Sequence, residues 1–283
     1  MDAPYAILEP LEDGIARLLA RNPSPYTYTG TQTYFVGGET EAIIVDPGPD
    51  SDDHVTAMLE ALGKRRLVAI ACTHTHRDHS PASRPLKAAT GAPIIGCAPL
   101  SLEATGPRAD AAFDRDYAPD RVLEDGETLF ADGIVLEAVA TPGHTSNHLC
   151  YAVGGALLTG DHVMGWSTTV VVPPDGDMGS YMESLDKLRR REDRVYYPAH
   201  GPAIENPTRL VRHMIGHRMQ RERQILKRLE AGDSEIGEIV ANCYPGLDPR
   251  LVPAAGGSVS AHLVELERQG RVERMEGDRW KPA

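Results

Sequence analysis

The chain of 283 residues is long enough for one large domain, or for one domain with a small appendage. Its hydrophobic fraction of 41% and charged fraction of 25% are typical of a soluble globular protein, and no apolar run approaches the length of a membrane span. The net charge of -12 disfavours tight, non-specific binding to nucleic acid, because contacts with phosphate groups need Lys and Arg. The four cysteines are scattered without a Cys-x-x-Cys pair, and no export signal is visible, so we expect a cytoplasmic protein without a membrane partner.

The charge is divided unevenly between two parts of the chain. Residues 1–206 carry 16 Lys and Arg against 30 Asp and Glu, whereas residues 207–283 carry 13 against 11. An acidic body suits a site that binds metal cations. Asn206-Pro207 is a good helix start, with a capping residue followed by proline, so we place a domain boundary between residues 206 and 207.

The first elements in chain order are a β-hairpin, a helix and a buried strand. After a Pro- and Thr-containing lead-in over residues 18–30, residues 31–45 turn at Gly37-Gly38 and predict a hairpin. Apolar residues at helical spacing predict a helix over residues 52–64, on which His54 is expected to lie at the surface. The continuous apolar run of residues 67–72 predicts a buried strand.

A cluster of metal-binding residue types follows that strand. His74, His76, Asp78 and His79 lie within six residues, in the pattern His-x-His-x-Asp-His. Imidazole and carboxylate groups suit zinc and other first-row divalent metals, and four donors on one loop can serve two ions. A loop that is rich in histidine by chance is the alternative, but the complete pattern is far more specific than a single histidine.

Further elements of the same kind continue to residue 197. They are a helix over 81–90, a strand over 92–96, a surface loop over 105–121, hairpins over 128–139 and 148–161, a helix from about 180 to 191, and a strand over 194–197. The run of arginines at residues 189–191 is expected to be a solvated helix end, because cations are favoured there.

Several strand-like runs end in a potential metal ligand. Besides the cluster, these ends carry Asp46, His144, Asp161 and His200. Each of them alone could be an ordinary turn or loop residue. Because sheets collect strand ends along one edge, the set together predicts one pocket with enough donors for two metals and open positions for water and substrate.

Residues 207–283 predict helices followed by a β-hairpin. A long helix from Pro207, a short helix over 234–244 and a helix over 258–269 precede two short strands, 271–274 and 278–280. This order suggests a winged-helix module. Such a module could bind nucleic acid, pack on the body or form a homodimer, and its nearly neutral charge does not favour the first role.

These motifs resemble the metallo-β-lactamase superfamily, and within it the β-lactamase-like protein 2 subgroup. The resemblance covers nearly the whole chain and rests on residues 30–34, 73–80, 141–145, 160–165, 181–185 and 198–202. It implies an α/β protein, with a metallo-β-lactamase αββα sandwich over residues 1–206 and a small winged-helix domain over 207–283. Ser80-Pro81-Ala82 departs from the family, which often has Gly-Gly beside the metals.

The resemblance also implies a ligand for every metal position. His74, His76 and His144 would hold one zinc ion, Asp78, His79 and His200 a second, and Asp161 would bridge them. Asp46 would orient the ligands. His148 could contact substrate or support the ligands, or it could be a core histidine, and His162 is expected to be structural. Residues 166–169 and 173–179 could form a pocket wall.

The implied chemistry is hydrolysis by a metal-bridged hydroxide, with Asp78 as the catalytic residue that orients the nucleophile and shuttles a proton. Because the subgroup contains an endoribonuclease, a phosphodiesterase acting on single-stranded RNA is the first expectation. Hydrolysis of a small carbonyl substrate, such as a β-lactam, a lactone or a glyoxalase II-like thioester, is the alternative. A non-enzymatic binding module is a third reading, which the complete ligand set makes the weakest.

Overall fold

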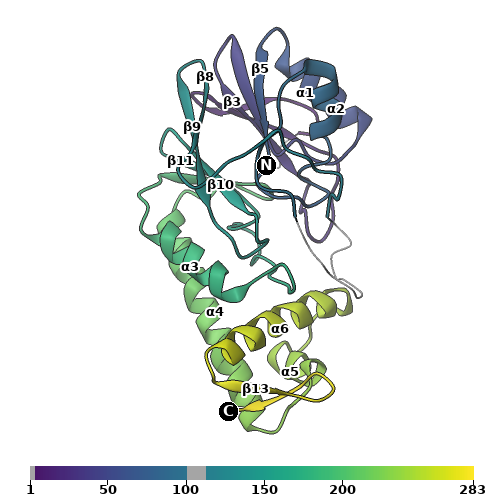
Figure 1. Cartoon of the computed structure of the whole chain (residues 1–283), viewed down its shortest axis with the longest axis vertical. Coiled ribbons are helices and arrows are strands. Elements are labelled where there is room, and N and C mark those ends of the chain that lie inside the picture. The colour runs from purple at the N-terminus through teal and green to yellow at the C-terminus, as the bar shows by residue number, and fades with distance from the viewer. Residues whose placement is uncertain (1–3, 101–112) are drawn as a thin grey trace.

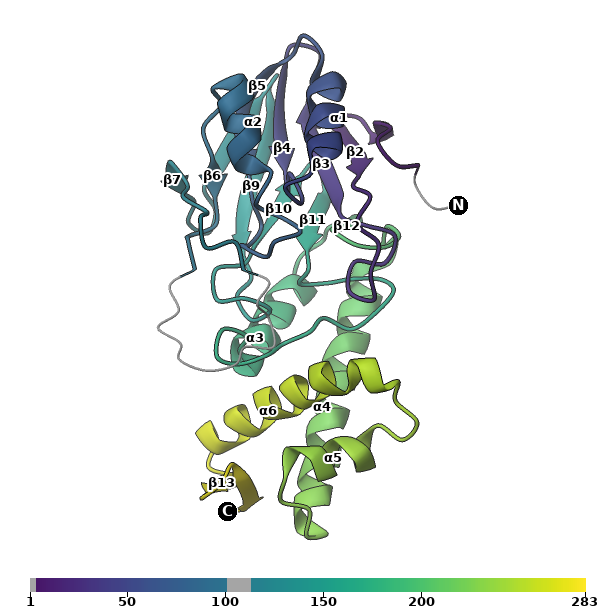
Figure 2. The same ribbon diagram turned by 90° about the vertical axis from the view of Figure 1, so that its right-hand side faces the viewer.

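The computed structural model describes residues 4–100 and 113–283, which form a layered body and a smaller C-terminal unit (Figure 1). The body places two five-stranded sheets face to face, with helices on the outer faces (Figures 1 and 2). This is the αββα sandwich that the sequence predicts. None of the helices in the described residues has both the length and the hydrophobicity needed to cross a bilayer.

The first sheet carries the metal-binding cluster at the end of its last strand. Its strands lie in chain order: β1 (Glu9–Glu12), β2 (Ile15–Leu19), β3 (Gln32–Gly37), β4 (Glu41–Val45) and β5 (Arg66–Ala71). Neighbouring strands are antiparallel except for β4 and β5, which are parallel. Helices α1 (Asp52–Leu62) and α2 (Ser83–Thr90) cover its outer face, and their Met58 and Leu86 are fully buried there.

The second sheet lies between the two hydrophobic cores of the body. Its order is β12 (Val195–Pro198), β11 (Ala156–Gly160), β10 (Leu149–Val153), β9 (Ile134–Ala140) and β8 (Thr128–Ala131). Successive side chains of a strand point to opposite faces. On β10, Tyr151 therefore packs into the core between the sheets, whereas Cys150 faces the core under α3 (Met178–Arg189).

The N-terminal part of the body differs from its predicted lead-in. Residues 18–19 belong to β2, which pairs with β1 across a turn at Gly14, where φ is +76°. Ile15, Leu18 and Leu19 are buried, and this burial supplies the stability that their local sequence does not signal. The strand predicted over 92–96 is shorter: β6 (Ile95–Gly96) pairs in parallel with β7 (Arg121–Val122), and Ile94 forms an isolated parallel bridge with Ile70.

Two further expectations concern single segments. The surface position expected for His54 is wrong: its side chain is 4% exposed, and its Nε2 lies 2.9 Å from the hydroxyl of Thr33. The loop predicted over 105–121 lies partly outside the described residues. In its described part, Phe113 and Tyr117 are buried, so this stretch packs on the body.

The C-terminal unit has its own core and the order predicted for a winged helix. It contains α4 (Pro207–Glu230), α5 (Ile236–Cys243), a short 3-10 helix (Pro249–Leu251), α6 (Val252–Arg268), β13 (Val272–Met275) and β14 (Arg279–Pro282). Helix α6 begins six residues before the predicted start at residue 258. Pro253 is tolerated in its first turn, and Gly256-Gly257, which lowers helix propensity, is held by tertiary packing.

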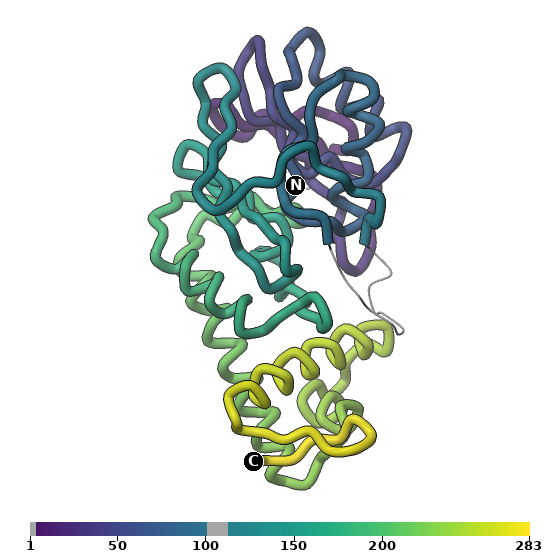
Figure 3. The backbone as a smooth tube through the Cα atoms, in the orientation of Figure 1, coloured from purple at the N-terminus to yellow at the C-terminus, as the bar shows by residue number. Residues whose placement is uncertain are grey.

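Helix α4 joins the body to the C-terminal unit (Figure 3). Its first half buries Val211 and Met214 in the core under the second sheet, and its second half buries Ile225 and Leu229 in the C-terminal core. The boundary that we predict between residues 206 and 207 therefore falls at the start of a helix that both cores share.

Candidate metal centre

The ligands predicted from the sequence come together at one edge of the sandwich. The cluster follows β5, His144 lies between β9 and β10, Asp161 follows β11 and His200 follows β12. Gln32 at the start of β3 helps to join the edges of the two sheets, since its amide group donates to the carbonyl oxygens of Pro198 (3.1 Å) and Gly201 (2.5 Å). This join places the His200 loop beside the cluster, although neither Gln32 nor its contacts were predicted.

The seven side chains form two adjoining groups of potential ligands. Within each group the ligand atoms lie within 4.8 Å of one another; the groups are His74, His76, His144 and Asp161, and Asp78, His79 and His200. In the first group, His76 Nδ1 lies 2.8 Å from His74 Nε2 and 3.1 Å from His144 Nε2. Three imidazole nitrogens this close fit the coordination of one common ion.

Asp161 lies between the two groups. One carboxylate oxygen, Oδ2, is 3.6 Å from Nε2 of His144 and 3.6 Å from Nε2 of His79. The other, Oδ1, is 3.2 Å from Nε2 of His200, which in turn lies 3.2 Å from Asp78. This is the position that the resemblance implies for a bridging carboxylate.

Hydrogen bonds behind the histidines turn their Nε2 atoms toward the centre. His79 Nδ1 donates to Asp46 (2.9 Å), His144 Nδ1 to the Val170 carbonyl (2.6 Å) and His200 Nδ1 to the Gly30 carbonyl (3.2 Å). Each bond leaves an Nε2 lone pair for a metal. Among the described residues, the buried Nε2 atoms of His79 and His200 and Oδ1 of Asp161 have no hydrogen-bond partner. These orphaned atoms fit a bound divalent cation.

Asp46 organises two of the ligands at once. Its carboxylate accepts hydrogen bonds from the Thr73 amide (2.7 Å), the Thr73 hydroxyl (2.8 Å) and His79 Nδ1. Because the Thr73 hydroxyl donates to Asp46, its oxygen accepts from His74 Nδ1 at 3.0 Å. Asp46 thereby sets the orientation of His79 directly and of His74 through Thr73.

The electrostatics of the site favour the metal-binding forms of His76 and Asp78. Burial, together with the neighbouring His144, lowers the pKa of His76 to about 3, so its ring is neutral and has a lone pair. Burial alone would raise the pKa of Asp78, but His79 and His200 hold it well below its usual range. A neutral imidazole and an ionised carboxylate are the forms that bind metal.

His148 lies beneath the centre and not on its substrate side. It is 1% exposed, its Nδ1 lies 2.9 Å from the Thr141 hydroxyl, and its Nε2 accepts from the Asp161 amide at 3.3 Å. A side chain at Gly160 would strike this ring, since a Cβ there would lie 2.7 Å from Nε2. The supporting role is therefore favoured over contact with substrate. His162 is likewise buried, with its ring 4.7 Å from that of Tyr181, in keeping with a structural role.

Two further residues, Thr169 and Arg218, support Asp161 in a role that was not predicted. The Thr169 hydroxyl lies 2.8 Å from the Asp161 carbonyl and 2.9 Å from the His162 carbonyl. The Thr169 carbonyl accepts from the guanidinium of Arg218, a buried side chain of α4 that also donates to Ser258 (3.3 Å) and lies over the Tyr181 ring. The sequence signal was a cation in the apolar stripe of α4, four residues after Met214.

A pocket of about 400 Å³ opens over the metal ligands. Its polar lining includes His76, Asp78, His144 and Asp161, with Thr27 and one cation, Arg77. The rest of its lining is apolar and comes from Tyr26, Met164, Val170, Val172, Pro253 and Ala254. The wall predicted from residues 166–169 and 173–179 is instead formed by residues just outside these segments, and by the start of α6.

Comparison with known proteins matches two family profiles to separate parts of the chain. The profile of the Metallo-beta-lactamase superfamily matches residues 26–200, and that of the Beta-lactamase associated winged helix domain matches residues 236–280. A Beta-lactamase-like protein 2 homolog of Caenorhabditis elegans is 32% identical over 278 residues, covering 94% of this chain and 88% of the relative. An Atrochrysone carboxyl ACP thioesterase of Aspergillus fumigatus is 31% identical over 259 residues, covering 90% and 77%. The crystal structure of a metallo-beta-lactamase family protein from Thermus thermophilus superposes with a TM-score of 0.78 at 22% identity, covering 96% of this chain and 99% of that one.

Proposed function

The chain belongs to the metallo-beta-lactamase superfamily, and from this premise we propose that it is a metal-dependent hydrolase of carboxylic esters or thioesters with an apolar acyl group. The observation that carries the proposal is the pocket over the ligands. Six of its lining residues present an apolar surface beside the metal ligands: Tyr26, Met164, Val170, Val172, Pro253 and Ala254. Such a pocket holds an apolar group while the scissile carbonyl faces the metals.

The metals of this proposal are two zinc ions. The donor set of five imidazoles and two carboxylates suits zinc and other first-row metals and does not suit magnesium or calcium, which prefer oxygen ligands. His74, His76 and His144 would hold one ion, Asp78, His79 and His200 the other, with Asp161 between them. When bound, such ions polarise a carbonyl oxygen and lower the pKa of water.

The side chains of the protein supply orientation and proton transfer. Asp78 lines the pocket with its side chain 27% exposed, so its carboxylate can orient the attacking water and accept its proton. Arg77 also lines the pocket and can pair with a carboxylate elsewhere on the substrate. Asp46, Thr169 and His148 hold the ligands in place and do not touch the substrate.

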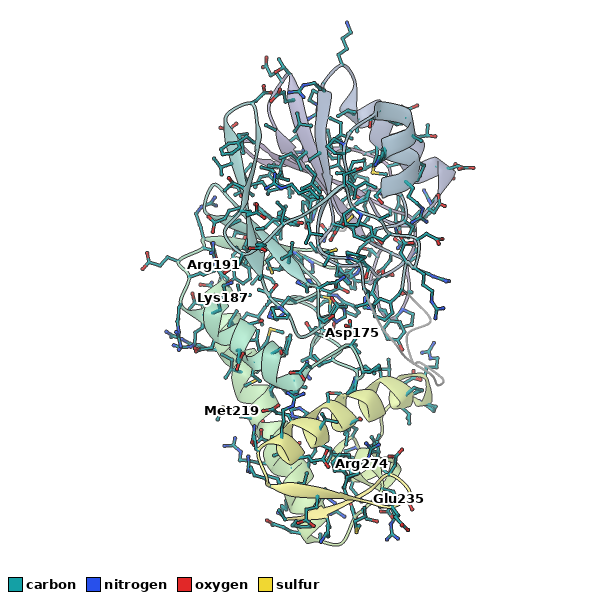
Figure 4. All side chains as sticks on the ribbon, in the orientation of Figure 1. Asp175, Lys187, Arg191, Met219, Glu235 and Arg274 are labelled. Atoms are coloured by element: carbon teal, nitrogen blue, oxygen red, sulfur yellow. The ribbon has the colours of Figure 1, made fainter. Side chains whose placement is uncertain are left out.

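A phosphodiesterase on single-stranded RNA is the second candidate. Tyr26 lines the pocket and is 52% exposed, so an aromatic face for stacking a base lies beside the ligands. The charge argues against it, because Arg77 is the one cation among the described lining residues. Lys187 and Arg191, which Figure 4 labels at the end of α3, are both paired: Lys187 with Asp125 and Arg191 with Asp193.

The first experiment measures the turnover of three substrates by zinc-loaded protein. They are an acyl thioester, an aryl ester and a labelled single-stranded RNA. The control is His76→Ala, which removes a ligand from the first group. We expect turnover of the esters that is lost in the variant and changes little with salt concentration. RNA cleavage that is lost in His76→Ala and falls steeply with salt, without ester turnover, would establish the second candidate instead. Turnover of none of the three would leave the binding-module reading.

A cytoplasmic location completes the proposal. All four cysteines are free thiols, and Cys72, Cys97 and Cys150 are buried. Free thiols are the state that a reducing compartment maintains.

A further inference from the structure

The start of helix α6 belongs to the lining of the substrate pocket. Pro253 and Ala254 lie in the first turn of α6 and line the same cavity as His76, Asp78 and Asp161. The remaining apolar lining comes from the body, through Tyr26 and the segment that holds Met164, Val170 and Val172. Two parts of the chain that are far apart in sequence therefore share one pocket.

The first half of helix α6 is held against that body segment. At Gly257 a Cβ would lie 2.6 Å from Val172 Cγ2, so the absence of a side chain lets the helix approach this pocket residue closely. One residue further, the Ser258 hydroxyl accepts from Arg218, which also binds the Thr169 carbonyl. The first half of α6 is thus fixed by packing and by a buried hydrogen-bonded cation.

The far end of α6 is tied to the same region of the body. Arg268 pairs with Asp177 at 2.5 Å, and the Asp177 carboxylate also caps α3 by accepting from the Ser180 amide at 2.8 Å. Figure 1 shows α6 lying across the end of the body next to α3. A helix held at both ends presents its first turn in a defined position, which selectivity for a ligand requires.

We propose that the C-terminal domain selects the acyl group of the substrate, with Pro253 and Ala254 as specificity-determining residues that contact the acyl chain. This inference rests on the proposed ester or thioester hydrolysis. Ala254 is half-buried and small, so the space beside it is available to a ligand. Each methylene group that enters the pocket should improve binding about fourfold.

The test introduces bulk at this position and compares chain lengths. Ala254→Phe fills the pocket from the α6 side, Ala254→Leu fills it less, and Ala241→Phe makes the same change on the exposed face of α5. For zinc-loaded protein, two quantities are measured: kcat/KM for aryl acetate and hexanoate esters, and Kd by calorimetry for acetohydroxamate and hexanohydroxamate. Hydroxamates chelate metal, so their binding reports on the pocket without turnover.

We expect the wild type to prefer the six-carbon chain by about tenfold or more in both measurements. Ala254→Phe should reduce this ratio to about one, Ala254→Leu should give an intermediate ratio, and Ala241→Phe should keep the wild-type ratio. A ratio that is unchanged in both Ala254 variants, or absent in the wild type, would overturn the inference. A chain-length preference in hydroxamate binding that Ala254→Phe abolishes, without turnover of any ester, would uphold the inference and reject the proposed function.

Discussion

Replacement of Asp46 by Asn tests whether the metal centre depends on the hydrogen bonds behind its ligands. Asp46 has φ of +49°, a conformation that Asn tolerates well, so the change adds little backbone strain. The carboxylate accepts three hydrogen bonds, on Oδ1 from the Thr73 amide and on Oδ2 from the Thr73 hydroxyl and His79 Nδ1. An amide group has only one oxygen, and its nitrogen cannot accept.

The size of the effect follows from the donor that loses its partner. If the side-chain oxygen of the introduced asparagine faces the Thr73 amide, its side-chain nitrogen meets His79 Nδ1–H. His79 must then either lose this bond or move its proton to Nε2, the atom that faces the metals. If the asparagine side chain is flipped, the buried Thr73 N–H loses its acceptor instead. Either arrangement forfeits a bond to a charged group, about 1.5–3 kcal/mol. We therefore expect zinc affinity to fall by roughly 10- to 100-fold.

The assay is competition for zinc with a chromophoric chelator, on the wild type and two Asp→Asn variants. Asp132 is the matched control, because it also has φ of +49° and accepts from Thr40 and Glu41 in an exposed turn away from the ligands. Asp132→Asn should keep wild-type affinity. Equal zinc affinity in Asp46→Asn and wild type, or an equal loss in both variants, would refute the reasoning.

Three other changes test separate parts of the structure. Arg218→Lys should lower kcat for an ester about tenfold and change KM less than threefold, because it loosens Thr169 and hence Asp161. Arg221→Lys is the control and should leave kcat unchanged, since the contacts of Arg221 are to Cys243 and Tyr244. Burial lowers the pKa of His54 in the folded state to about 4, below the usual 6.5. Between pH 4 and pH 6.5 the ring is therefore protonated in the unfolded state and neutral in the folded state. As the pH drops from 6.5 to 4, the free energy of unfolding measured with urea should fall in the wild type. This fall should be on the order of 3 kcal/mol larger than in His54→Gln. Removal of metal with a chelator should lower the midpoint of thermal unfolding, since zinc at a thousandfold excess over Kd stabilises the folded state by about 4 kcal/mol. An unchanged midpoint would contradict a metal site.

The candidate ligands and most strands and helices could be predicted because each has a local signal, whereas the αββα layering was implied by the resemblance to the family. His74, His76, Asp78 and His79 are adjacent in sequence, and His144, Asp161 and His200 follow apolar runs that became β9, β11 and β12. Hairpins turned at glycine pairs and helices stopped by glycine are equally local features. The structure adds that these ends meet at one place, which the sequence could only infer from their number.

The errors concern positions where tertiary contacts override local preference. His54 lies on a polar helix face by composition, yet it is buried near Thr33 of the neighbouring sheet. The helix predicted over 258–269 leaves out Gly256-Gly257, although Gly257 is the place where α6 packs on Val172. Arg218 occupies a core position of α4 because the carbonyl of Thr169 lies opposite. None of these partners is near in sequence, so no local pattern identifies them.

The same contacts change what a deletion experiment on this protein can show. A cut after residue 206 would remove Val211 and Met214 from the core under the second sheet, and Arg218 from Thr169. It would also remove Pro253 and Ala254 from the pocket. Loss of activity in such a fragment would follow whether the C-terminal domain binds nucleic acid or selects an acyl group. Single substitutions that keep α4 and α6 in place, such as Ala254→Phe against Ala241→Phe, separate the two roles.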